Sequence, residues 1–354
     1  MLDDATICKL PKTLLHDHLD GGLRPATIVE LADAADFELP TRDPEELGDW
    51  FHRGARRGSL PLYLEGFWVT CGVMQTEAAL RRVARERVED LIADGVVYAE
   101  LRFAPFLHTE RGLSLDEVMD AVFDGLREGS DDGRRCVVRM LICGLRNLEP
   151  KSSLEMAALA VRFRERGVVG FDLAGDEAGH PPKKHLEAFQ YLRRANFNIT
   201  IHAGEGFGLS SIWQALQYCG AHRIGHGTRL YEDLEEGSPS EGTLADYVRD
   251  HRILLEMCLS SNVHTAAVES FAAHPFQKYF QAGFRCTLNT DNTLMSATTL
   301  SQEWQIARDH YGLGLADFER LAVDGVLGSF LPYAERRALI DERIRPAYQA
   351  SPPT

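Results

Sequence analysis

Eight short apolar segments constrain the fold of this chain more than any other feature. Each is a nearly continuous hydrophobic run, the pattern of a strand that is buried on both faces of a sheet. The segments are Lys12–His18, Val96–Phe103, Val137–Leu145, Gly167–Leu173, Asn198–His202, Arg223–Gly227, Ile253–Cys258 and Phe284–Asn289. Helical periodicity fills the intervals, as in Glu77–Gly95 and in Leu154–Gly167, which ends in a glycine. Strand and helix alternating eight times predict an α/β fold, a parallel (β/α)8 TIM barrel.

The first interval is much longer than the others. Residues 24–90 should hold several extra helices, a helical insertion after the first strand that caps the C-terminal mouth of the barrel. Barrels of this length are commonly one domain, so we expect residues 1–354 to form a single barrel domain. The polar segment Glu232–Gly242 is expected to be an exposed loop.

The bulk composition argues against several classes of protein. A formal net charge of −15 repels phosphate backbones, so a nucleic-acid partner is not expected. No run approaches the roughly 18 apolar residues of a membrane span, and the N-terminus shows no secretory signal. The seven cysteines lack CxxC spacing and indicate reduced, mostly buried thiols. We therefore predict a cytoplasmic protein, a monomer or small homo-oligomer without a membrane partner, that binds a neutral or cationic small molecule.

Polar groups follow almost every predicted strand, at the end where barrel enzymes carry their active sites. His16 and His18 end the first strand, His202 the fifth and Asp291 the eighth. Side chains alternate along a strand, so the first two histidines share a face, and strands one and eight are neighbours in a closed barrel. Three imidazoles and a carboxylate predict one metal site per chain. Zn²⁺ is favoured, although iron, manganese or cobalt accept the same ligand types.

Two further groups accompany this predicted site. A bound divalent cation lowers the pKa of its water to about 7, and His226 in RIGHG could hold that water and take its proton, with Asp291 assisting. Glu205, three residues after His202, could donate a proton to the group under attack. Plainer interpretations stay open, namely that Glu205 is a first-turn helix acid and that His226 is a packed histidine in a tight turn.

Taken together, several motifs resemble those of the adenosine deaminase family of the amidohydrolase superfamily, from about residue 10 to about residue 348. They are LLHDHLDGGL, VVGFDLAGDE, TIHAGE, RIGHG, LEMCLSSN and LNTDN, and MQT, VVYAELRFAP, EAGHPP and DNTLMS resemble its actinobacterial branch. The resemblance implies a zinc barrel of purine salvage that hydrolyses adenosine and 2′-deoxyadenosine to inosine and 2′-deoxyinosine, releasing ammonia.

The resemblance also implies roles for single residues. The zinc ligands would be His16, His18, His202 and Asp291. Glu205 would protonate purine N1, and His226 would orient and deprotonate the water. The backbone N–H of Gly175 would meet N3, and Asp20 would accept from a ribose 5′-hydroxyl, with His18 also beside the substrate.

A stripe of apolar residues occurs in the predicted insertion. Leu60, Tyr63, Leu64 and Phe67 recur at the spacing of one helix face, which is typical of a core-facing stripe. The resemblance implies instead that this helix forms an apolar gate over the substrate, and such a gate excludes water from the site.

Some positions depart from the family pattern. Asn292 stands where many relatives carry Asp, and its amide can donate directly to purine N7, so we predict that N7 recognition is preserved. Ala104 replaces a common Ser, Asn147 a common His and Leu259 a common Pro. These three changes bear on the choice of substrate.

Three other functions remain open. The substrate could be adenine, an aminofutalosine-type nucleoside or a modified adenosine, whereas Asp20 would repel the phosphate of AMP. A different mononuclear metal-dependent hydrolase could use the same barrel. A non-catalytic binding protein is disfavoured by the complete ligand set with Glu205 and His226 beside it.

Overall fold

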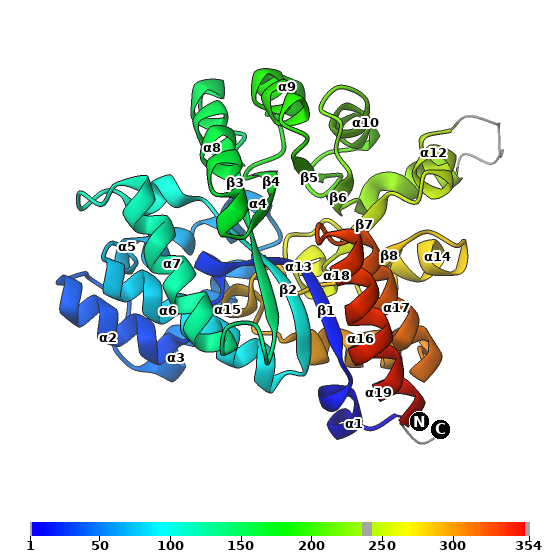
Figure 1. The fold of residues 1–354 in the computed structure, drawn as a ribbon, viewed down its shortest axis with the longest axis horizontal. Coiled ribbons are helices and arrows are strands. Elements are labelled where there is room, and N and C mark those ends of the chain that lie inside the picture. Colours follow the sequence, from blue (N-terminus) through cyan, green and yellow to red (C-terminus); the bar gives the residue numbers. More distant parts are fainter. Residues whose placement is uncertain (1, 236–242, 351–354) are drawn as a thin grey trace.

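A sheet of eight parallel strands forms the centre of the molecule (Figure 1). The structure, a computed structural model, describes residues 2–235 and 243–350. Each strand pairs with the next along the chain: β1 Lys12–His18, β2 Val96–Phe103, β3 Val137–Leu145, β4 Val168–Ala174, β5 Asn198–Ala203, β6 Arg223–His226, β7 Leu254–Met257 and β8 Cys286–Leu288. Every strand ends within two residues of its predicted bounds. The predicted (β/α)8 barrel is confirmed.

Hydrogen bonds after the end of β8 close the barrel onto β1. The backbone N–H of Asp291 donates to the carbonyl of His16 at 3.0 Å, and the N–H of His18 donates to the carbonyl of Asp291 at 2.7 Å. The side-chain oxygen of Asn289 accepts from the N–H groups of Leu15 and His16. Three of the predicted metal ligands therefore lie on the closing seam itself.

Helices surround the barrel and follow its strands. They are α1 Asp4–Lys9, α2 Pro25–Ala35, α3 Pro44–Ala55, α4 Leu60–Leu64, α5 Phe67–Val73, α6 Glu77–Ala93, α7 Leu115–Ser130, α8 Pro150–Arg162, α9 Leu186–Arg194, α10 Leu209–Gln217, α11 Tyr231–Glu235, α12 Leu244–Asp250, α13 Leu259–His264, α14 Phe276–Gln281, α15 Thr293–Ser296, α16 Leu300–Tyr311, α17 Leu315–Gly328, α18 Tyr333–Ala338 and α19 Arg345–Ala350. Figure 1 shows α7 to α10 arranged one after another around the outside of the strands. Within the described residues, no helix is long and apolar enough to cross a membrane.

The insertion between β1 and β2 consists of helices α2 to α6, close to the predicted range. The single gate helix predicted over residues 60–67 is wrong, because α4 ends at Leu64 and α5 begins at Phe67. Gly66 lies at this break. A Cβ there would come within 3.1 Å of Phe51 and 3.2 Å of Met295, so the position favours glycine, which is a poor helix former.

Two smaller predictions also need correction. The predicted helix at Leu154–Gly167 begins earlier, at Pro150, because proline is well suited to the first helical turn. The predicted loop Glu232–Gly242 is helical at its start, in α11, and residues 236–242 lie outside the described residues. The predicted state of the cysteines agrees with the structure, since all seven are free thiols and only Cys8 is not buried.

Candidate metal centre and catalytic pocket

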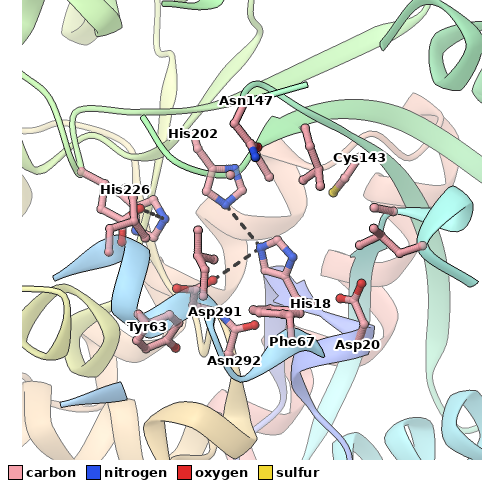
Figure 2. A pocket seen from close by; sticks show the side chains of 18 residues that line it. His18, Asp20, Tyr63, Phe67, Cys143, Asn147, His202, His226, Asp291 and Asn292 are labelled. Carbon is pink, nitrogen blue, oxygen red and sulfur yellow. Dashed lines mark hydrogen bonds and ion pairs between the residues drawn. The ribbon is translucent and has the colours of Figure 1, made fainter. Parts of the chain in front are cut away.

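A cavity of about 200 Å³ opens at the carboxyl ends of the strands (Figure 2). It is lined by all the predicted site residues except His16: His18, Asp20, Leu60, Tyr63, Leu64, Phe67, Gly175, His202, Glu205, His226, Asp291 and Asn292. Ala104 and Asn147, two of the departures from the family pattern, line it as well. His16 is fully buried. The apolar residues of the predicted gate, although they are divided between α4 and α5, thus line one cavity.

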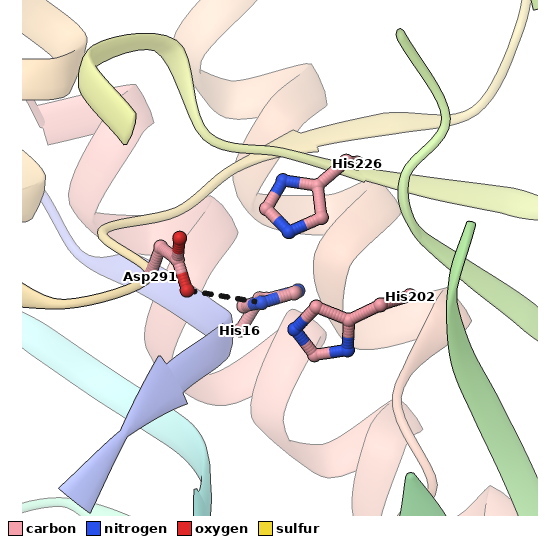
Figure 3. Close-up of side chains that lie close together, drawn as sticks. All are labelled: His16, His202, His226 and Asp291. Atoms are coloured by element: carbon pink, nitrogen blue, oxygen red, sulfur yellow. Dashed lines mark ion pairs between the residues drawn. The ribbon is translucent and has the colours of Figure 1, made fainter. Parts of the chain in front are cut away.

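Imidazole and carboxylate groups converge at one end of this cavity (Figure 3). One donor atom each from His16, His202, His226 and Asp291 lies within 4.8 Å of all the others. The Nε2 of His18 belongs to the same group, 3.3 Å from His202 Nε2 and 3.5 Å from Asp291 Oδ1. The structure therefore brings the four predicted ligands together and adds His226 as a fifth candidate.

Two of the imidazoles are oriented by buried carboxylates. His16 Nδ1 lies 2.9 Å from Glu256 Oε2, and His202 Nδ1 lies 3.0 Å from Asp172 Oδ2. A carboxylate holds the proton on Nδ1, so each Nε2 is left with a free lone pair for a metal ion. Burial opposes ionisation of Glu256, but the positive charge of Arg102 helps to hold its pKa well below the usual range.

The spacing of the donor atoms matches a tetrahedral cation. Two ligand atoms that are each about 2.1 Å from a tetrahedral ion lie roughly 3.4 Å apart. The separations are 3.3 Å for His18 to His202, 3.5 Å for His18 to Asp291 and 3.4 Å for His16 Nε2 to Asp291. Among the described residues, His16 Nε2 has no hydrogen-bond partner despite full burial. These donors fit one ion of the zinc type.

The two carboxyl groups at the centre have opposite protonation preferences. Burial and the negative charges of Asp291 and Glu177 raise the pKa of Glu205 well above its usual range. Burial opposes ionisation of Asp291 too, but its contacts with the surrounding imidazoles, His16 first, hold its pKa well below the usual range. Ser261 Oγ also donates to Asp291 at 2.5 Å. The site thus pairs a carboxyl group whose pKa is raised with one whose pKa is lowered, an arrangement that suits acid–base chemistry.

Glu205 does not lie in the first turn of a helix, so that plainer interpretation is wrong. It belongs to the turn that follows β5, and α10 begins only at Leu209. The carboxylate of Glu177 accepts hydrogen bonds from four consecutive backbone N–H groups of this turn: Gly204 at 2.8 Å, Glu205 at 2.9 Å, Gly206 at 2.7 Å and Phe207 at 3.1 Å. Glu177 therefore fixes the position of the predicted proton donor. Sequence reasoning gave it no role, although it closes the DLAGDE motif.

Two site residues have unusual backbone conformations. His226 has φ +62° and Asp291 has φ +58°, in the left-handed region that non-glycine residues rarely adopt. Both are buried, and both face the donor cluster. Backbone strain of this kind concentrates at functional sites. The interpretation of His226 as a mere packing residue is therefore not supported.

Two buried arginines bind groups that position the metal-ligand candidates, and the sequence analysis did not identify them. Arg102 contacts both orienting carboxylates, Asp172 at 3.0 Å and Glu256 at 2.9 Å. Arg146 donates to the carbonyl of His202 at 2.6 Å. Arg102 is the last residue but one of a predicted strand and Arg146 directly follows another, in RFAP and LRN. Charged residues inside a strand predicted to be buried were the signal that could have identified Arg102, since buried charges need partners.

The other end of the cavity is polar at one point. Asp20 is buried, and among the described residues its Oδ1 has no hydrogen-bond partner. His108 Nε2 lies 3.8 Å from Asp20 Oδ2, and Cys71 completes a second group of close donor atoms. Asn292 Oδ1 also lacks a partner within the described chain. Asp20 and Asn292 both line the cavity.

Comparison with known proteins identifies the family of the chain. A family model described as adenosine deaminase matches residues 11–346. The adenosine deaminase of Mycobacteroides abscessus is 52% identical, over 98% of each chain, and adenosine deaminase 1 of Streptomyces coelicolor is 53% identical, over 97% of this chain and 88% of its own. The crystal structure of an adenine deaminase from Arthrobacter aurescens is similar, with a TM-score of 0.85 and 27% identity over 94% of this chain and 98% of that one. With its metal-type donor cluster and paired carboxyl groups, the chain belongs to the adenosine deaminase family.

Proposed function

We propose that this enzyme hydrolyses the 6-amino group of adenosine and 2′-deoxyadenosine, releasing ammonia and forming inosine and 2′-deoxyinosine. The observation that carries the proposal is a pair of buried carboxyl groups with opposite pKa shifts, raised for Glu205 and lowered for Asp291, at the donor cluster of a cavity of about 200 Å³. Relatives that are 52–53% identical over nearly the whole chain are named adenosine deaminases. We infer a role in purine salvage.

We propose that one Zn²⁺ per chain is held by His16, His18, His202 and Asp291. The tetrahedral spacing of their donor atoms and the predominance of nitrogen ligands support zinc. A bound zinc ion lowers the pKa of a water molecule toward neutrality, so that the water becomes a nucleophile. His226 is excluded from the ligand set in this proposal and acts on the water.

The directions of the pKa shifts then indicate which group is the acid of the reaction and which is the base. Burial and nearby negative charge raise the pKa of Glu205 and so favour its protonated form, which suits it to donate a proton to purine N1. Protonation of N1 draws electron density from C6, where the water attacks. Asp291 is ionised and can accept the proton of the water. His226 lies 3.4 Å from Glu205 and can hydrogen-bond to the water from the other side.

The remaining polar groups of the cavity suit a nucleoside. We propose that Asp20 accepts a hydrogen bond from the ribose 5′-hydroxyl, that the N–H of Gly175 donates to N3 and that Asn292 donates to N7. Gly175 has φ +93°, which favours glycine and allows the close backbone approach. His18 also lines the cavity and lies beside the substrate. The unpartnered oxygen of Asp20 would repel a 5′-phosphate, so AMP is disfavoured.

We propose that Leu60, Tyr63, Leu64 and Phe67 cover the bound purine. All four line the cavity, and Leu64 and Phe67 are only partly buried. Tyr63 is held by a hydrogen bond of 2.9 Å between its hydroxyl and Ser296 Oγ. Covering the purine removes water and strengthens the polar interactions around N1 and C6.

Adenine is the second candidate substrate, because the similar structure from Arthrobacter aurescens is an adenine deaminase. The free Asp20 oxygen favours the nucleoside, since adenine has no ribose hydroxyl to satisfy it. The single-domain organisation, the cytoplasmic location, the oligomeric state and the absence of a nucleic-acid partner stay predictions.

The test is a comparison of kcat/KM for ammonia release from adenosine, 2′-deoxyadenosine, adenine, AMP and aminofutalosine, together with elemental analysis of the purified protein. We expect the two nucleosides to lead and about one zinc per chain. Higher kcat/KM for adenine or aminofutalosine would replace the proposed substrate, and no ammonia from any aminopurine would favour another metal-dependent hydrolase. The Asp20→Asn variant should weaken discrimination against AMP.

A further inference from the structure

A line of buried hydrogen bonds runs from a backbone amide to His226. The N–H of Phe276 donates to His274 Nδ1 at 3.1 Å. His274 Nε2 lies 3.1 Å from Asn262 Oδ1, and Asn262 Nδ2 lies 2.9 Å from His226 Nδ1. Asn262 belongs to α13, whereas His274 lies two residues before α14 and His226 ends β6. All three side chains are at most 3% exposed, so water does not compete for these bonds.

The hydrogen bond from the Phe276 N–H to His274 determines which group donates in each of the other two hydrogen bonds. A backbone N–H can only donate, so His274 Nδ1 is an acceptor and carries no proton. Burial lowers the pKa of His274 to about 3, which agrees with a neutral ring at neutral pH. A neutral imidazole has one proton, which must then be on Nε2. His274 therefore donates to Asn262, and the amide oxygen of Asn262 must face it.

The orientation of the Asn262 amide in turn determines which nitrogen of His226 accepts a hydrogen bond. With its oxygen bonded to His274, its NH₂ group faces His226 Nδ1 and donates to it. Nδ1 of His226 is then an acceptor, and the single proton of its neutral ring lies on Nε2. That Nε2–H faces the reaction centre, 3.4 Å from Glu205 Oε2.

The two neighbouring imidazoles have the opposite arrangement. His16 and His202 contact carboxylates through Nδ1, so their Nε2 atoms carry lone pairs. An Nε2 that carries a proton cannot bind a metal ion. The difference between a carboxylate partner and an amide partner therefore separates His226 from the ligands, although donor distances alone group them together.

We propose that His274 and Asn262 are positioning residues that fix His226 as the Nε2–H tautomer, keep it out of the metal ligand set and make it a hydrogen-bond donor to the attacking water. This tautomer cannot take a proton at Nε2, so the predicted role of His226 as the base passes to Asp291. The catalytic consequence rests on the proposed function, whereas the tautomer itself does not.

The tautomer is measured by ¹⁵N NMR of histidine-labelled, metal-free enzyme, with the His226 signals assigned by comparison with His226→Gln. We expect a protonated Nε2 and an unprotonated Nδ1 for His226 in the wild type. The reverse pattern would overturn the proposal, and it does so without any variant. If the expected pattern is seen but no aminopurine is deaminated, the proposed function fails and the positioning role stands.

Two variants test whether the hydrogen-bonded line from His274 through Asn262 to His226, here called the relay, sets the tautomer of His226. In Asn262→Asp a carboxylate accepts from both rings, so His226 should move its proton to Nδ1 and kcat should fall about 100-fold or more, the usual effect of losing one donor at a reacting centre, while KM changes little. His274→Asn can keep an acceptor for the Phe276 N–H but loses the link to Asn262, so signals of both His226 tautomers should appear. An unchanged His226 pattern in both folded variants would show that the relay does not set the tautomer.

Discussion

Glu177 is not among the residues that line the cavity, yet replacing it should displace Glu205. The Glu177 carboxylate accepts from four consecutive N–H groups, and those of Gly204 and Glu205 are fully buried. In Glu177→Ala these two lose their acceptor, at about 1–3 kcal/mol each, whereas the partly buried N–H groups of Gly206 and Phe207 can turn to water. We therefore expect a loss of roughly 2–6 kcal/mol in the free energy of unfolding, measured by urea denaturation of the metal-loaded protein.

Activity should fall with stability, because the turn carries the proposed proton donor. General acid catalysis contributes about 10²–10⁴-fold, so kcat for adenosine should decrease within that range in Glu177→Ala. Glu177→Gln keeps one acceptor oxygen but turns an NH₂ toward one backbone N–H, so its loss of stability should be smaller, about 1–3 kcal/mol. Hydrogen exchange of the amides of residues 204–207 should be faster in both variants.

The matched control is Glu187→Ala, which removes an exposed acid from α9. Its unfolding free energy should change by less than about 0.5 kcal/mol, as for most surface substitutions. If Glu177→Ala behaves like this control, with unfolding free energy and kcat close to wild type, then the turn does not need its carboxylate and the reasoning is wrong.

Three further predictions concern the proton donor, a buried carboxyl group behind the site and the purine contact. Glu205→Gln should lower kcat by about 10²–10⁴-fold while zinc content stays unchanged, and normal turnover would remove Glu205 as the donor. Burial raises the pKa of Glu303 to about 7, so the stability that it contributes is fully present below about pH 4.5 and is lost as the pH rises to about 7. At about 1.4 kcal/mol per pH unit this is roughly 3–4 kcal/mol in all, most of it between pH 5 and pH 8, and urea denaturation at those two pH values should show that Glu303→Gln lacks the difference. Because Asn292 is proposed to donate to purine N7, 7-deazaadenosine should have a lower kcat/KM than adenosine, and equal values would contradict that contact.

Much of the fold could be predicted because its signals are local. A strand buried on both faces must be apolar along its length, and the helices between the strands show their own period. The eight strands consequently appear within two residues of their predicted ends. The break between α4 and α5 was not predictable from the apolar spacing, because it coincides with the close packing of Gly66 against Phe51 and Met295, which are remote in sequence.

The ligand types of the metal centre could also be predicted from the sequence. Barrel topology sends the carboxyl end of every strand to the same mouth, so His16, His202 and Asp291 had to approach one another once the fold was known. Orienting partners are different, because they depend on which atoms come within 3 Å after folding. Glu177 lies 28 residues from the Glu205 amide that it binds, and no local pattern marks such a pair.

The sequence by itself determined the barrel, the end of the barrel that carries chemistry and the atoms offered to a metal ion, because periodicity and residue type are properties of the chain alone. Only the tertiary structure decided which imidazoles present a lone pair and which presents a proton, and which carboxyl group has its pKa raised. Those properties follow from hydrogen-bond partners and burial, as in the contact of Asn262 with His226 at 2.9 Å, and these exist only when distant segments are packed together.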